Sequence, residues 1–188
     1  PKLMNSSFAN VVGSFFSAKF QRSIEELQVS QESEACIIAG YVTGGVLRGV
    51  ITGVFIFGVS AFFTHPVVRH WEVIVVFIIL TAFVFSAAGL INAIFAKKFD
   101  DVSMFPTFVL TPLTYLGGVF YSIHSLPGVW QKISLFNPIV YMVNGFRYGF
   151  YGVSDVPVPV SLMILVLLGA ILIGINFYLL RKGIGLKN

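Results

Sequence analysis

The charged side chains are the residues of this chain that could carry chemistry, and Arg48 stands apart from the others. It lies inside a long apolar stretch, thirteen residues after Ala35. At about 1.5 Å per residue, a helix would place it on the order of 20 Å into that stretch. An arginine at such a depth in a membrane is expected to face a bundle interior or a wet cavity. We therefore predict that Arg48 contacts a substrate or a lipid phosphate in a translocation path, or pairs with a helix carbonyl or an asparagine.

The acidic residues lie between the apolar stretches or at their ends. The eight acids are Glu25, Glu26, Glu32, Glu34, Glu72, Asp100, Asp101 and Asp155. Carriers driven by protons or sodium commonly use acids buried within the membrane as ion sites. Because none is predicted at depth here, the sequence argues against an ion-coupled carrier.

The sequence also lacks motifs for ATP binding, metal binding and catalysis. No G-x-x-x-x-G-K-[ST] segment occurs. The spacing of His65, His70 and His124 matches no strong zinc motif, so no metal site is predicted. No nucleophile, base and acid form a catalytic arrangement, so no catalytic residue is predicted either. If the protein moves a substrate uphill, the energy must come from another polypeptide.

The composition indicates a polytopic membrane protein of the all-α class. Hydrophobic residues make up 56% of the 188 positions and charged residues only 11%, whereas a soluble domain carries about 25% charge. The basic residues are dispersed, which favours topology signals over a nucleic-acid site. The single cysteine, Cys36, excludes an internal disulfide.

Five apolar stretches are predicted to span the membrane, since each approaches the roughly 20 residues that a spanning helix needs. They cover about 3–20, 36–63, 71–96, 103–122 and 159–180. The chain begins at Pro1 without a signal-peptide pattern. We therefore expect a single transmembrane domain, 1–188, that is part of a longer protein.

The loops between these spans alternate between two sides, and their basic residues are unequal. Seven lie on one side: Lys19, Arg22, Lys97, Lys98, Arg181, Lys182 and Lys187. Three lie on the other: Arg69, Lys132 and Arg147. Basic residues are retained in the cytoplasm. The first side and the C-terminus are therefore predicted to be cytoplasmic.

The first cytoplasmic loop predicts a short amphipathic helix over about 20–29. Ser23 and Glu26 are spaced as in a capping box. An apolar stripe at i, i+4 and i+7 is formed by Phe20, Ile24 and Leu27. Such a helix would either insert into a groove on a cytoplasmic partner or rest on lipid headgroups.

Glycine and proline mark two of the spans. Gly45, Gly49 and Gly53 recur every four residues, which predicts close helix packing. Pro106 and Pro112 predict a kink with freed carbonyls in the fourth span, and this feature serves either packing or a gate.

The outer segment between the last two spans predicts two short helices that dip back into the membrane, about 127–135 and 138–151. The segment is too apolar for a solvated loop and too rich in proline for one spanning helix. Each helix begins near a proline, which the first turn tolerates. Asn137 is placed to cap the second helix.

The same segment resembles the carboxy-terminal hallmark of type-2 ABC exporter permeases. The matching residues are Pro112, Gly117, Gly118 and Phe120, then Leu126, Pro127 and Trp130, then Asn137, Pro138, Tyr141 and Arg147. FQRSIEEL and FAKKFDD are similar to the YadH-like subgroup of bacterial inner-membrane permeases. The similarity extends over essentially the whole chain.

This resemblance implies a six-helix subunit, of which about five transmembrane helices and the two re-entrant helices are present here. It implies a homodimer with two copies of an ABC ATPase subunit, in the bacterial inner membrane. ATP and Mg would bind the partner ATPase, and this chain would bind no cofactor. The first loop matches the coupling helix, with Phe20, Gln21, Arg22, Ser23, Ile24, Glu25, Glu26 and Leu27 as the coupling residues. Gln31 replaces the proline that usually follows this helix.

We therefore expect the permease subunit of an ATP-driven exporter, without an active site of its own. A passive channel or a secondary carrier is the first alternative, and it would transport without any ATPase. A membrane-embedded enzyme is the second, and its catalytic residues would lie outside this chain.

Overall fold

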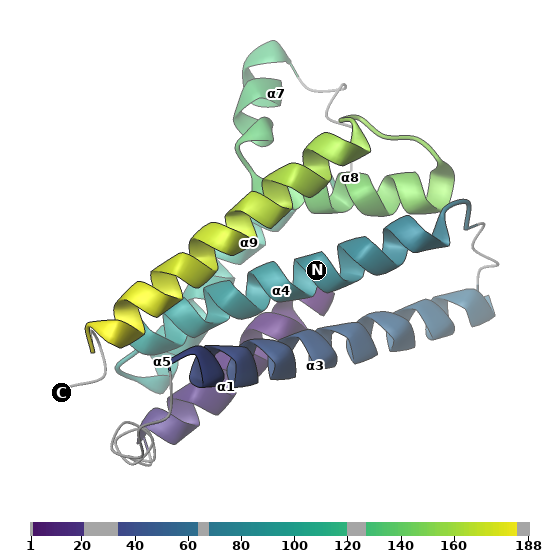
Figure 1. Ribbon diagram of the computed structural model, residues 1–188. Coiled ribbons are helices and arrows are strands. Elements are labelled where there is room, and N and C mark those ends of the chain that lie inside the picture. The colour runs from purple at the N-terminus through teal and green to yellow at the C-terminus, as the bar shows by residue number, and fades with distance from the viewer. Residues whose placement is uncertain (1, 21–33, 64–67, 120–126, 184–188) are drawn as a thin grey trace.

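The protein folds into a bundle of helices in the computed structural model, which describes residues 2–20, 34–63, 68–119 and 127–183 (Figure 1). The elements are α1 (Lys2–Phe20), α3 (Glu34–Phe63), α4 (Trp71–Phe95), α5 (Phe99–Phe105), the π-helical turn η1 (Pro106–Leu110), α6 (Thr111–Leu116), α7 (Gly128–Leu135), α8 (Pro138–Tyr151) and α9 (Val158–Arg181). No strand occurs in the described residues, which confirms the predicted all-α class. Three described segments are long and apolar enough to cross a membrane: Ala35–Phe63, Trp71–Phe95 and Val158–Arg181.

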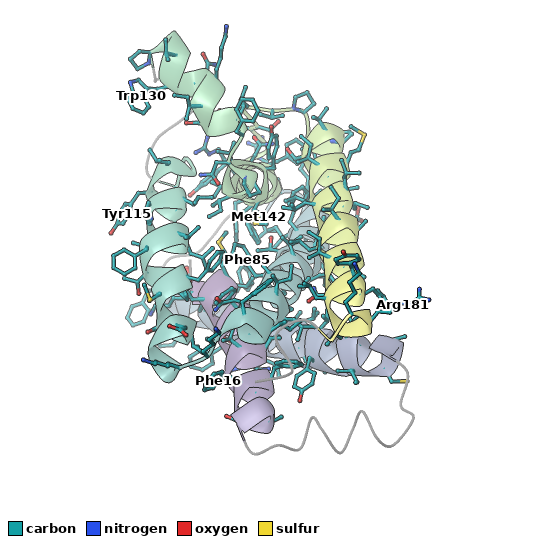
Figure 2. The ribbon with its side chains drawn as sticks, turned by 90° about the vertical axis from the view of Figure 1, so that its left-hand side faces the viewer. Phe16, Phe85, Tyr115, Trp130, Met142 and Arg181 are labelled. Atoms are coloured by element: carbon teal, nitrogen blue, oxygen red, sulfur yellow. The ribbon has the colours of Figure 1, made fainter. Side chains whose placement is uncertain are left out.

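Helix α4 is the centre of the bundle. It contacts α1, α3, α8 and α9 (Figure 1). Half of its apolar segment is buried (50%), against 17% for α9 and 6% for α3. Figure 2 shows Phe85 of α4 and Met142 of α8 directed into the interior. The outer faces of α3 and α9 are apolar and exposed, as expected for helices whose solvent is lipid.

The glycine repeat of α3 sets the register of three helices. At three successive levels, a glycine of α3 lies against one residue of α1 and one of α4: Gly53 with Leu3 and Ile78, Gly49 with Ser7 and Ala82, and Gly45 with Val11 and Ser86. A Cβ atom at Gly49 would overlap the Ser7 hydroxyl. The helix packing predicted from the glycine spacing is thus confirmed. Residue numbers rise together in α1 and α4 and fall in α3, so α3 is antiparallel to both.

The segment with two prolines forms α5, η1 and α6 in succession. Proline has no N–H and displaces the preceding carbonyls, and the helix widens into a π-helical turn at Pro106–Leu110. Threonine hydroxyls satisfy carbonyls here: Thr107 Oγ1 donates to Ser103 O at 2.8 Å and Thr111 Oγ1 to Pro106 O at 3.0 Å. The predicted disturbance of the helix is present. The helical segment covers 99–116 rather than 103–122, because Gly118 turns the chain with a φ of 72°.

The two ends of the bundle carry different elements (Figure 1). The end of α1, the start of α3, the α4–α5 connection and the end of α9 lie at one end. Helices α7 and α8 and the start of α9 lie at the other. Lys97, Lys98, Arg181 and Lys182 therefore lie at the first end, whereas Arg69, Lys132 and Arg147 lie at the second.

Candidate functional sites around two arginines

Asn137 ties the end of the proline-kinked helix to α8. It is the N-cap of α8, where its Oδ1 accepts a hydrogen bond from Ile139 N at 3.0 Å, as the sequence predicts. Its Nδ2 donates to Leu113 O at 2.6 Å. Pro138 occupies the first turn, where its missing N–H costs nothing. A single side chain thus serves a helix start and a helix end at once.

Arg147 of α8 closes the same region from the other side. Its Nη1 donates to Asp155 Oδ2 at 2.6 Å, and its Nη2 donates to Gly118 O at 2.9 Å. The Arg147 side chain is 22% exposed and that of Asp155 is 10% exposed. The charge of Arg147 is therefore neutralised within the chain, and the glycine turn after α6 is fixed to α8.

Asn144 is a member of this group that the sequence analysis did not single out. Its Oδ1 accepts from Asp155 N at 2.7 Å and Val156 N at 3.1 Å. Its Nδ2 donates to Val156 O at 2.6 Å and Ser161 Oγ at 3.0 Å. These bonds hold the α8–α9 connection and place Asp155 beside Arg147. The one available signal was an amide in the middle of an amphipathic helix.

We name Asn137, Tyr141, Asn144, Arg147 and Asp155 the motif cluster. The Tyr141 hydroxyl completes it by donating to Leu135 O at 2.6 Å, which attaches the end of α7. Three predicted residues of the outer helices lie outside it: Pro138 begins α8, Pro127 is exposed, and Trp130 on α7 points away from the bundle (Figure 2). The hydrogen bonds of the cluster join α6, α7, α8 and α9, so the cluster holds these helices together and its role is structural.

Arg48 lies in a different setting, on the outer face of α1 and α3. Its Nη1 donates to Asn10 Oδ1 at 2.8 Å, so an asparagine partner, one of the two predicted alternatives, is present. Beside it, Ser6 Oγ and Thr52 Oγ1 are 2.9 Å apart, and Thr52 Oγ1 donates to Arg48 O at 2.8 Å. Arg48 remains exposed.

These contacts belong to a continuous polar strip along two antiparallel helices. We name it the polar seam, and it consists of Ser6, Asn10 and Ser14 on α1 with Gly40, Gly44, Arg48 and Thr52 on α3. Both sets follow a spacing of four residues, which keeps them on one face of each helix. Beyond Asn10 the seam opens into a cavity of about 330 Å³, which is also lined by Cys36 and Tyr41.

The predicted coupling helix lies almost entirely outside the described residues. Gln21, Arg22, Ser23, Ile24, Glu25, Glu26 and Leu27 fall between α1 and α3, and so does Gln31. Phe20 is the last residue of α1. His65 and His124 also fall outside. In the part of the chain that the structure describes, no group of three or more His, Cys, Asp and Glu residues could hold a metal ion.

An apolar helix bundle joined at one end by the motif cluster is the architecture of a polytopic membrane protein. The ABC-2 type transporter family matches residues 3–151, and the chain belongs to this family. It is 50% identical to the inner membrane transport permease YadH of Escherichia coli K12 over 186 residues, which are 99% of this chain and 73% of that protein. YadH of Shigella flexneri gives the same values.

A more distant relative is nodulation protein J of Rhizobium leguminosarum bv. viciae. It is 23% identical over 145 residues, which are 76% of this chain and 55% of that protein. No solved structure matches the chain. The chain is a membrane permease subunit of an ABC transporter in the inner membrane, and such a permease works with an ATPase partner.

Proposed function

We propose that this permease is the membrane half of an ATP-driven exporter, in which two copies of the chain combine with two copies of a separate ATPase subunit. ATP and Mg²⁺ bind that ATPase, and the permease holds no cofactor. The 21–33 connection meets the ATPase from the cytoplasm, where the C-terminus also lies. The observation that carries this proposal is that the end of α1 and the start of α3, which this connection joins, lie at the more basic end of the bundle.

The packing of α1 supports a mechanical role for this connection. Helix α1 contacts α3 and α4 along its length, and the three glycine levels leave little room for sliding. A push on residues 21–27 therefore reaches three helices as one body. ATP-driven closure of the two ATPases would rock this body and move the permease between inward-facing and outward-facing states.

In this proposal α1, α3, α4, the α5–α6 segment from residue 103 onward and α9 span the membrane. Helix α1 has 19 residues, which at about 1.5 Å each approach the roughly 30 Å of a hydrocarbon core. Helices α7 and α8 form the outer re-entrant pair. The exposed apolar faces of α3 and α9 support this arrangement, because lipid would cover them.

The decisive test replaces the apolar stripe of the coupling helix. We expect Ile24→Asp combined with Leu27→Asp to reduce permease-stimulated ATP turnover about tenfold or more, since two carboxylates would have to enter an apolar groove. ATPase co-purification and ATP turnover in liposomes measure the effect. Gln28→Asp is the matched control, because it adds a charge outside the apolar stripe.

Unchanged coupling in the double variant would overturn the coupling assignment. Substrate flux in liposomes without nucleotide or ATPase would instead establish the channel or secondary-carrier alternative. These two results are distinct, because the first concerns the interface with the ATPase and the second concerns the energy source.

A further inference from the structure

We propose that the polar seam between α1 and α3 binds the anionic headgroup of a membrane amphiphile, and that Arg48 contacts its phosphate. The occupant is one molecule with a phosphate-bearing head and apolar tails. The proposal concerns binding alone, so it holds whether or not the coupling mechanism above is correct.

The charge of Arg48 is the first argument. A guanidinium has five N–H donors, and the side-chain partner of Arg48 among the described residues is the neutral amide of Asn10. No carboxylate in the described residues pairs with it, whereas Arg147 has Asp155. An arginine near the middle of an apolar span is costly without a counter-charge. A phosphate supplies that charge and matches the planar donors of the guanidinium.

The space along the seam beyond Asn10, the hydrogen-bond partner of Arg48, is the second argument. A Cβ atom at Gly40 would meet no atom within 4 Å, and one at Gly44 would meet only Asn10 Nδ2 at 3.9 Å. The same helix closes Gly45 and Gly49 against α1 and α4. The open glycines therefore leave a cavity of about 330 Å³, near the lower limit of about 300 Å³ for small-molecule sites. Its polar lining includes Asn10 and Ser14.

The apolar flank of the seam is the third argument, because it points to an amphiphile. Leu47, Ile51 and Phe55 of α3 follow the same four-residue spacing next to Arg48 and Thr52, and they are 62%, 65% and 72% exposed. Acyl chains would lie against this surface while the headgroup occupies the seam. A free phosphate would leave this surface uncovered.

A second copy of the chain is a less suitable occupant. In a two-fold symmetric interface the same patch meets itself. The two Arg48 guanidinium groups would then approach each other, and the described residues of the seam offer no acid to separate them. Charge complementarity thus favours an anionic ligand over self-association.

The test measures binding of fluorescent phosphatidylglycerol and phosphatidylcholine to the purified permease–ATPase complex without nucleotide. We expect Arg48→Gln to weaken phosphatidylglycerol binding about tenfold, as for a lost hydrogen bond between charged groups, and to leave phosphatidylcholine unchanged. Arg48→Lys should retain most of the affinity. Gly40→Leu should block the site by filling it, whereas Gly58→Leu, also on α3 with no atom within 4 Å, should not.

Modification of Cys36 gives a second readout, since Cys36 lines the cavity and is the chain's single cysteine. Phosphatidylglycerol should slow its reaction with a thiol reagent, and glycerol phosphate should not. Unchanged phosphatidylglycerol binding in Arg48→Gln would overturn the proposal, and so would equal binding by the Gly40→Leu and Gly58→Leu variants. Equal competition by glycerol phosphate would overturn the proposal in favour of a free phosphate. Cross-linking of two chains in a Gly44→Cys variant would overturn it in favour of a second copy.

Discussion

Arg147 and Arg48 both lie on helices of this permease, and the fold treats their charges in opposite ways. Arg147 is paired with Asp155 and with the carbonyl of Gly118. Arg48 has one amide partner and stays exposed. Because its charge is neutralised by an ion pair within the chain, Arg147 stabilises the fold and is a scaffold residue. The comparison shows that the depth of an arginine says less about its role than the charge of its partners does.

The two regions also differ in what they join. The motif cluster links four helices at one end of the bundle, and each of its polar side chains makes at least one bond to another element. The polar seam lies between α1 and α3, the two helices that the 21–33 connection joins. The polar side chains of the motif cluster are bonded to each other and to the backbone, which stabilises that end of the bundle. The polar seam keeps an exposed arginine and a cavity, as a ligand-binding surface requires.

The largest effect should come from Asn144, which is 2% exposed and bonded to three groups of the α8–α9 connection and to Ser161 of α9. We expect Asn144→Leu to lower the free energy of unfolding by about 4 kcal/mol, because several buried polar groups lose their partner. Denaturant titration in mixed micelles measures it. Asn92→Leu is the control, since Asn92 makes one long bond of 3.4 Å to Val102 O. An equal loss of unfolding free energy in both variants would contradict the stabilising role of the motif cluster.

The direct comparison of the two arginines should give the next largest effect. Arg147→Gln leaves the partly buried Asp155 without its counter-ion, and we expect a loss of about 2 kcal/mol in the free energy of unfolding. Arg48→Gln loses one exposed hydrogen bond, so its cost should stay below about 1 kcal/mol. A double-mutant cycle with Asp155→Asn should show coupling to Arg147. If Arg48→Gln proves as destabilising as Arg147→Gln, then Arg48 also has a structural role, and the two arginines do not differ as proposed.

The smallest effect concerns Asp101 in the first turn of α5, just before the fourth predicted span begins at 103. Its carboxylate accepts the backbone N–H groups of Lys97 at 2.9 Å and Lys98 at 3.0 Å, and these bonds hold its pKa below the ordinary value of 3.8. A lowered folded pKa means that the stabilisation is complete above the ordinary value and is lost as the pH falls through the lowered one. The stability difference between the wild type and Asp101→Asn should therefore shrink on acidification. A difference that does not vary with pH would exclude this role.

Several features of the fold could be predicted from the sequence because they depend on local physics. The all-α class follows from composition and apolar periodicity, since lipid forces backbone groups into helices. The capping role of Asn137 follows from its place before Pro138, and the close packing of Gly45, Gly49 and Gly53 follows from their spacing. The helix within the fourth predicted span ends at Leu116, six residues before the predicted end of the span at 122, because apolar composition does not reveal the glycine turn at Gly118.

The sequence by itself determined that this chain is a membrane permease of helices, with one deep arginine and a motif typical of its family. Only the tertiary structure decided which polar groups meet. After the chain reverses between α8 and α9, Asp155 pairs with Arg147 and its backbone N–H bonds to Asn144. Arg48 bonds to Asn10 on an antiparallel helix. Local pattern fixes the face of a helix on which a side chain lies, whereas the partner across from it depends on the packing of segments that are distant in sequence.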